Sequence, residues 1–141
     1  MIVLDTNVIS EIFRPSPERR VPRWLASLTG DVAIASVTLA ELLARVRGLP
    51  NGKRKDELAK GIDAALDPCR GSRAILPFDD RAAERYADVL MTRESAGAPI
   101  SMADAQIAGM CLVHDGSCAT RNTKDFAHTG VDVVNPWEFD G

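Results

Sequence analysis

The sequence predicts an α/β fold, in which helices cover both faces of a mostly parallel central sheet. Short apolar runs, typical of strands buried on both faces, alternate with longer segments of helical periodicity. Gly- and Pro-containing breaks separate these segments, and such alternation favours parallel strands joined by helices. The 141 residues suit one domain, residues 1–141, with a substantial core, and we find no repeat or domain linker.

The first predicted strand is followed directly by an acid and a helix. Residues 2–4 form a continuous apolar run that ends at Asp5, and Thr6 and Asn7 come next. Apolar residues then recur at helical spacing over residues 8–13. In an open parallel sheet this order displays a polar group in the crevice at the strand ends. Alternatively, Asp5 or Thr6 simply caps the helix.

The next segments continue the alternation as far as residue 66. An amphipathic helix is expected at 18–29, where Val21, Trp24, Leu25 and Leu28 share one face. A short buried strand at 32–35 follows the turn at Gly30 and Asp31, and a leucine-rich stripe predicts a helix at 36–47. A charged helix at 53–66 ends before Asp67 and Pro68, because the residue before a proline disfavours the helical conformation. Trp24, Leu25 and the neighbouring helices could form a surface for a second copy or a partner protein, or ordinary core.

The second half of the chain repeats the pattern with shorter strands. Strands are expected within residues 73–77, 117–120 and 131–134, and helices at 81–96 and 101–114. Breaks at Gly97 to Pro99 and at Asp115 and Gly116 bound the last helix. Residues 121–126 are expected to form a polar loop or a single helical turn.

The charge balance is mildly acidic, with a formal net charge of −3. A protein that grips nucleic acid through bulk charge is usually basic. Basic residues instead cluster within 14–23 and 45–55, namely Arg14, Arg19, Arg20 and Arg23, then Arg45, Arg47, Lys53, Arg54 and Lys55. Each cluster can be a solvated helix face or a phosphate track, and an acidic site nearby would favour the second interpretation.

The three cysteines and the lack of an apolar stretch of membrane-spanning length indicate a cytoplasmic protein. Cys69, Cys111 and Cys118 are odd in number and lack metal-ligand or redox spacing, so we expect free thiols in a reducing compartment. No apolar segment is long enough to span a bilayer, and the N-terminus lacks the pattern of a signal peptide.

Four carboxylates lie where predicted strands end or helices begin: Asp5, Glu41, Asp104 and Asp125. Parallel strands place their carboxyl ends at one edge of the sheet, so acids at several such ends are expected to converge in one crevice. Structural roles are also open to them. Thr38 and Glu41 have the spacing of a capping box, as have Ser101 and Asp104.

Each acid has its own alternatives. Arg45 lies one turn after Glu41, so a surface ion pair is available to that acid. Asp104 shares the buried stripe of its helix, where an ionised carboxylate costs several kcal/mol unless it is paired or bound to a metal. Asp125 can belong to an ordinary turn, although the preceding Thr120 and Asn122 can orient an acid or a water.

Converging carboxylates would raise one another's pKa values and destabilise the fold. A divalent cation removes this repulsion, and oxygen ligands without His or Cys favour magnesium or manganese over zinc. Such an ion can turn water into a nucleophile and neutralise the charge that develops on a phosphodiester.

The ordered set of motifs resembles the PIN-domain ribonucleases, most closely the VapC or FitB-like toxins of bacterial toxin–antitoxin pairs. The matching segments occur in the family's order at residues 2–11, 37–42, 99–108, 119–126 and 133–137. The resemblance implies a PIN-like three-layer α/β/α sandwich.

The resemblance also implies a site and partners. Asp5, Glu41, Asp104 and Asp125 match the family's acidic quartet, which binds Mg²⁺ or Mn²⁺, and Asp5 and Asp104 match its most direct ligands. Thr6 and Asn7 are expected to support the first acid, and Thr120 and Asn122 the fourth acid and its water. Family members dimerise and are silenced by a small antitoxin whose tail lies over the acidic crevice. Larger toxin–antitoxin assemblies can bind DNA through the antitoxin.

The function that we expect is therefore that of a metal-dependent endoribonuclease acting as a toxin on RNA, without a membrane partner. A non-catalytic RNA- or protein-binding module of the same fold is the alternative. A haloacid-dehalogenase-type phosphatase needs a second acid two residues after the first, where this chain has Asn7. The chain has no Gly-x-Ser-x-Gly elbow, phosphate-binding loop or dinucleotide fingerprint, which disfavours other hydrolase and nucleotide-binding classes.

Overall fold

The computed structural model describes residues 1–141 and contains one five-stranded, entirely parallel sheet. The spatial order of the strands is β3-β2-β1-β4-β5. They are β1 (Ile2–Leu4), β2 (Val32–Ala35), β3 (Ile75–Leu76), β4 (Ser117–Ala119) and β5 (Val133–Val134). The predicted α/β class with a parallel sheet is confirmed.

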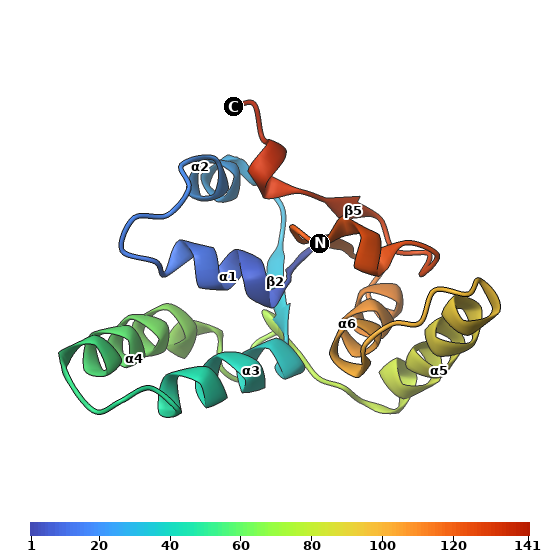
Figure 1. Cartoon of the computed structure of the whole chain (residues 1–141), viewed down its shortest axis with the longest axis horizontal. Helices are drawn as coiled ribbons and strands as arrows, with labels where there is room; N and C mark the ends of the chain where they lie inside the picture. Colours follow the sequence, from blue (N-terminus) through green and yellow to red (C-terminus); the bar gives the residue numbers. More distant parts are fainter.

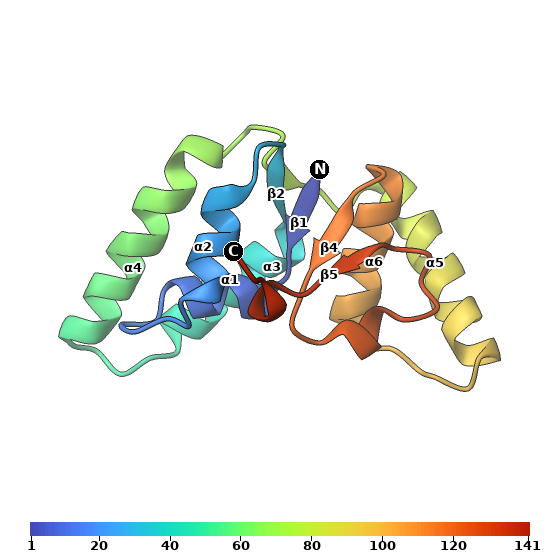
Figure 2. The ribbon, with the colours of Figure 1, turned by 90° about the horizontal axis from the view of Figure 1, so that it is seen from above.

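Six α-helices cover the two faces of this sheet. They are α1 (Thr6–Ile12), α2 (Arg20–Ser27), α3 (Ser36–Arg47), α4 (Lys53–Leu66), α5 (Asp80–Ser95) and α6 (Met102–Val113). Figures 1 and 2 show α1 to α4 on one side of the sheet and α5 and α6 on the other, so the molecule has three layers. Three short 3₁₀ helices complete the chain: η1 (Asp67–Cys69), η2 (Thr123–Phe126) and η3 (Pro136–Glu138).

Two cores form because successive strand residues point to opposite faces. In β1, Val3 packs into the core on the α5–α6 side, and Leu4 into the core on the side of α1 to α4. In β4, Cys118 and Ala119 divide between the two cores in the same way. This double burial explains why the strands are uninterrupted apolar runs in the sequence.

The observed boundaries of β2, α3 and α4 agree with the predicted ones, whereas α2 (Arg20–Ser27) is shorter than the predicted 18–29 and the edge strands also differ. Residues 32–35, 36–47 and 53–66 match the prediction in full. The edge strands β3 and β5 are shorter than the predicted 73–77 and 131–134. Pro77 lacks an amide hydrogen and cannot extend the β3 ladder. The polar segment at 121–126 contains η2, the predicted single helical turn.

The chain reverses its direction of strand addition between β1 and β4. From β1 it adds β2 and β3 on one side, and then returns to add β4 and β5 on the other side. The Asp5 amide donates to the Ala119 carbonyl at 2.9 Å, which ties the ends of the two strands together. Open parallel sheets bind ligands at the carboxyl ends of the strands flanking such a switch point.

A glycine brings α5 and α6 into close contact on one side of this point. A β-carbon at Gly109 of α6 would lie 3.0 Å from the Ala82 carbonyl oxygen and 3.0 Å from the Tyr86 amide nitrogen of α5. A side chain there would therefore force the two backbones apart. The contact fixes α6, which carries Asp104, against α5.

None of the helices is long and apolar enough to cross a membrane. All three cysteines are free, as expected, and Cys111 and Cys118 are buried. The hydrogen bond with Cys111 and burial raise the pKa of the Cys118 thiol above its usual range.

Candidate metal centre at the switch point

A polar hollow of about 310 Å³ opens at the carboxyl ends of β1 and β4. Three of the four predicted acids line it, namely Asp5, Glu41 and Asp104, whereas Asp125 does not. The predicted supporting residues Thr6, Asn7 and Asn122 also line it, and the other lining residues are Arg45, Ser101 and Ala103. A second hollow of about 230 Å³ lies among α1, α2, α4 and β2, and its twelve lining residues are all hydrophobic. The polar hollow is therefore the candidate site, because it brings three of the predicted acids together.

The Asp5 carboxylate is held by three hydrogen bonds. Oδ1 accepts from the Thr6 amide at 2.8 Å, so Asp5 does cap α1, as one interpretation of the sequence proposed. Oδ2 accepts from the Thr120 hydroxyl at 2.8 Å and from Asn7 Nδ2 at 3.1 Å. Oδ2 uses both of its acceptor sites in these contacts, whereas Oδ1 accepts one hydrogen bond and keeps a second site, so capping and ligand binding are compatible through Oδ1.

Burial raises the pKa of Asp5 above its ordinary value. The hydrogen bonds from Thr120, Thr6 and Asn7 lower this pKa, because they stabilise the ionised form, and the charge of Asp125 raises it. Asp5 is only 5% exposed and forms no ion pair with a Lys or Arg. Its negative charge is thus compensated by dipoles alone.

Asp104 occupies the first turn of α6 and faces the same hollow. Ser101 is the N-cap, and its hydroxyl oxygen accepts from the Asp104 amide at 3.2 Å, which is half of the predicted capping box. Burial raises the pKa of the Asp104 carboxyl, and the hydrogen bond with Ser101 lowers it. The charges of the other three acids raise it further: Asp5, Asp125 and Glu41. The four carboxylates therefore act on one another electrostatically.

Glu41 reaches the hollow from the second turn of α3. The capping box that the spacing of Thr38 and Glu41 left open as an alternative does not form, because α3 begins at Ser36 directly after β2, which places Thr38 inside the helix. Thr38 is buried, and its hydroxyl has no hydrogen-bond partner. Glu41 instead accepts a long hydrogen bond, 3.4 Å, from the Thr6 hydroxyl.

Arg45 does not form the ion pair with Glu41 that its spacing allowed. Its Nη1 donates to the Ser10 hydroxyl at 2.6 Å, and its side chain lines the hollow. It is the one basic residue among those lining the hollow.

Asp125 lies on η2 and is exposed. Its amide donates to the Asn122 carbonyl at 3.0 Å. Thr120 differs from expectation, since its hydroxyl donates to the first acid, Asp5, and accepts from the Asn122 amide at 3.1 Å and from Asn7. Thr120 thus connects the segment that carries Asp125 with the first acid.

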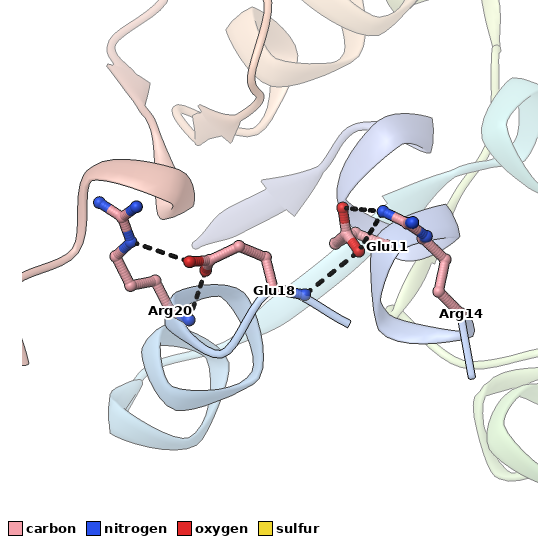
Figure 3. Close-up of polar contacts among 4 residues, drawn as sticks. All are labelled: Glu11, Arg14, Glu18 and Arg20. Carbon is pink, nitrogen blue, oxygen red and sulfur yellow. Dashed lines mark hydrogen bonds and ion pairs between the residues drawn. The ribbon is translucent and has the colours of Figure 1, made fainter. Parts of the chain in front are cut away.

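The first basic cluster is partly neutralised by its own acids, as Figure 3 shows. Arg14 donates to both carboxylate oxygens of the buried Glu11, which also accepts from the Glu18 amide at 3.3 Å. Glu18 in turn pairs with Arg20 at 3.1 Å. These contacts secure the connection between α1 and α2 and favour the interpretation of this cluster as a solvated surface.

The donor set of the hollow suits a hard divalent cation that keeps part of its hydration shell. No three His, Cys, Asp or Glu side chains lie close enough to hold an ion by themselves. Mg²⁺ is commonly bound by one or two carboxylates and several waters, unlike Zn²⁺, which takes a closed set of protein ligands. Asp5 and Asp104 carry raised pKa values and no basic partner, so a cation would relieve their unfavourable charge.

Arg93, which the sequence analysis did not single out, is 5% exposed and donates to backbone carbonyls of the loop before α6 and of the segment around Asp125. A signal existed, because Arg93 falls four residues after Val89 on the buried stripe of α5. The hydrogen bond of Asn7 to Asp5 agrees with the expected support of the first acid, whereas that of Thr120, which joins residues 115 positions apart, was missed.

Comparison with known proteins agrees with the fold and the order of the motifs. The PIN-domain family model matches residues 2–132. The chain belongs to the PIN-domain family. Toxin FitB of Neisseria gonorrhoeae is 43% identical over 138 residues, 97% of this chain and 99% of that protein. VapC ribonuclease Y4jK of Sinorhizobium fredii is 37% identical over 139 residues, 98% and 99% of the two chains.

A solved structure of the same group has nearly the same fold. A chain of the FitAB complex bound to an IR36 DNA fragment superposes with a TM-score of 0.92 at 40% identity, and the match covers 100% of this chain and 99% of that one. This PIN domain is accordingly a VapC/FitB toxin of the toxin–antitoxin systems.

Proposed function

We propose that this PIN-domain toxin is a metal-dependent endoribonuclease that hydrolyses RNA phosphodiesters with water. The observation that carries the proposal is the pair Asp5 and Asp104, which share one polar hollow at the switch point without a Lys or Arg partner. A ribonuclease is among the relatives, which supports RNA as the substrate.

Asp5 and Asp104 would hold Mg²⁺ or Mn²⁺, and Glu41 and Asp125 would complete the site, directly or through water. The bound ion supplies a nucleophilic water at neutral pH and stabilises charge on the phosphodiester. Asn7 and Thr120 fix the Asp5 carboxylate, so that it need not reorient when the substrate arrives. Because water attacks, and not the ribose 2′-hydroxyl, the products should carry 5′-phosphate and 3′-hydroxyl ends.

Arg45 is suited to contact a phosphate of the RNA at the rim of this hollow. It lines the hollow and is held by Ser10, without an acidic partner. A bound cation and Arg45 together would offset the acidic net charge of −3, which otherwise repels RNA.

We further propose a cognate antitoxin as the protein partner and a homodimer as the assembly, in the cytoplasm. The FitAB complex, which was solved with DNA, supports a partner of this kind and a larger DNA-bound assembly. The hollow is acidic, so an antitoxin segment that reaches it would carry Arg or Lys. Trp24 is 5% exposed and belongs to the core, whereas Leu25 lines the apolar hollow.

Digestion of RNA with and without EDTA, followed by mapping of the cut ends, tests the proposal. We expect cleavage by the wild type with Mg²⁺ or Mn²⁺, no cleavage with EDTA, and no cleavage by Asp104→Asn. Asp88→Asn is the matched control, since Asp88 lies on the exposed surface of α5. Equal turnover by the wild type and Asp104→Asn, or undiminished cleavage in EDTA, would contradict it. RNA binding without cleavage would favour the non-catalytic module.

A further inference from the structure

We propose that Arg93 is the positioning residue of the acidic site, because it fixes the two backbone segments that carry Asp104 and Asp125. This inference rests on the proposed metal-dependent function. It assigns a role to a buried cation that contacts none of the four acids through their carboxylates.

The Arg93 guanidinium donates hydrogen bonds to carbonyl oxygens of two separate segments. Towards η2, Nη1 of Arg93 donates to the carbonyl oxygens of Ala127 at 2.7 Å, Asp125 at 2.8 Å and Lys124 at 3.4 Å. Towards the loop before α6, Nε donates to the Ala98 carbonyl and Nη2 to the Pro99 carbonyl at 3.4 Å.

The burial of Arg93 makes these contacts obligatory. Arg93 is 5% exposed and forms no ion pair. A guanidinium removed from water is strongly destabilising unless its donors are satisfied, and here carbonyl dipoles are the only partners. The carbonyl groups must therefore remain around the Arg93 guanidinium, and this holds η2 and the loop before α6 in place. A lysine offers three donors from a single point, so it cannot serve two segments in the same way.

Both segments lead directly to an acid. Asp125 itself supplies one of the bound carbonyls, and the buried Phe126 anchors the same turn in the core. Pro99 is two residues before Ser101, the N-cap of α6, whose first turn contains Asp104. A single side chain of α5 thus sets the separation of η2 from the start of α6, and with it the separation of two acids of the site.

Metal binding by the protein without RNA tests this role independently of catalysis. We would measure the dissociation constant of Mn²⁺ from the free Mn²⁺ signal in electron paramagnetic resonance. The proteins are the wild type, Arg93→Lys, Asp125→Asn and the double variant, and Arg85→Lys is the matched control. Arg85 is also on α5, but its side chain is 58% exposed.

Arg93→Lys should weaken Mn²⁺ binding by roughly 10- to 100-fold, the usual effect of removing support from a ligand. In the double variant the loss of Mn²⁺ affinity should be smaller than the product of the two single losses, because part of the effect of Arg93→Lys acts through the Asp125 carboxylate that the second substitution removes. Arg85→Lys should bind like the wild type. Unchanged affinity in Arg93→Lys, or effects of the two substitutions that multiply, would overturn the positioning role. Absence of Mn²⁺ binding by the wild type would overturn the proposed function as well.

A second measurement uses the wild type alone and so does not depend on a folded variant. Solvent exchange of the Arg93 Nε proton, which is directed at the Ala98 carbonyl, can be followed by ¹⁵N NMR with and without Mg²⁺. If Arg93 positions the carboxylates that bind the metal, Mg²⁺ should hold its hydrogen bonds more firmly and slow this exchange. The same exchange rate with and without Mg²⁺ would contradict the proposal.

Discussion

The first and fourth acids of the site are held in two different ways. Asp5 is buried, and three donors hold its carboxylate directly, from Thr6, Asn7 and Thr120. Asp125 is exposed, and the hydrogen bonds that fix its segment involve its backbone, at Arg93 and at Asn122. The first acid is thus fixed at its oxygen atoms, whereas the fourth is fixed at its peptide unit.

This difference suggests a division of labour at the hollow. A carboxylate oriented by its own hydrogen bonds is ready to bind a cation without rearrangement. A carboxylate on a fixed backbone keeps its rotamers, so it can adjust to a hydrated ion or to a substrate phosphate. Substitutions at Asp5 should therefore cost more activity than equivalent ones at Asp125.

The largest effect is expected for Asp5→Asn. Loss of a direct ligand removes several kcal/mol of stabilisation by the metal, which corresponds to a decrease of about 10³-fold or more in kcat. An amide NH₂ would also face the donors of Asn7 or Thr120. The measurement is single-turnover RNA cleavage, with folding checked by circular dichroism.

Asp125→Asn, assayed beside it, should lose less activity than Asp5→Asn. Asp31→Asn is the control, because Asp31 lies at the amino end of β2, away from the carboxyl ends of the strands where the hollow lies. If Asp5→Asn lost no more cleavage activity than Asp125→Asn, the proposed difference between the first and fourth acids would be contradicted.

Thr120→Val should have the next largest effect, since it removes the donor that connects β4 with the first acid. We expect Mn²⁺ affinity to fall about 10-fold and the free energy of unfolding to fall by about 1–3 kcal/mol, because buried partners lose their hydrogen bonds. Chemical denaturation and Mn²⁺ titration measure the two quantities. Thr123→Val, an exposed position on η2, is the matched control, and indistinguishable behaviour of the two variants would refute the role of Thr120.

The smallest effect concerns stability without metal. Burial and the neighbouring acids raise the folded-state pKa of Asp104 above its ordinary value of 3.8. A raised pKa stabilises the fold below the unfolded-state pKa, and this contribution is lost as the pH rises through the folded-state value. Metal-free Asp104→Asn should therefore have a higher Tm than the wild type at pH 7, and this difference should shrink towards pH 4.

Calorimetry from pH 4 to 7 in EDTA measures this difference, and Mg²⁺ at pH 7 should reduce or reverse it. A metal-free variant that melts well below the wild type at pH 7 would indicate that Asp104 mainly caps α6.

Local sequence patterns were sufficient to predict the fold and the strand–helix and loop–helix junctions at which Asp5 and Asp104 lie. Asp5 and Asp104 each lie at a junction that hydrophobic periodicity and turn residues define, and parallel strands bring such junctions to one edge. The capping box left open as an alternative at Thr38 does not form, since β2 runs into α3 without a loop and the helix begins two residues earlier.

The support of Asp5 by its neighbours Thr6 and Asn7 was predicted, but the contacts made by Thr120 and Arg93 could not be, because they join residues far apart in the chain. Thr120 reaches Asp5 across 115 positions, and Arg93 reaches η2 across 31 to 34 positions. Backbone carbonyls bind Arg93, and every residue has a carbonyl, so no residue type marks the partner segment. What the sequence did contain was an arginine on an apolar stripe, which indicates a buried charge but not its partners.

Anomalous diffraction from a crystal grown with Mn²⁺ tests the central claim most directly. We expect a manganese peak in the polar hollow, with one oxygen of Asp5 and one of Asp104 at coordination distance, about 2.1 Å. A hollow without a peak at saturating Mn²⁺, or with either carboxylate turned to an arginine, would contradict the account.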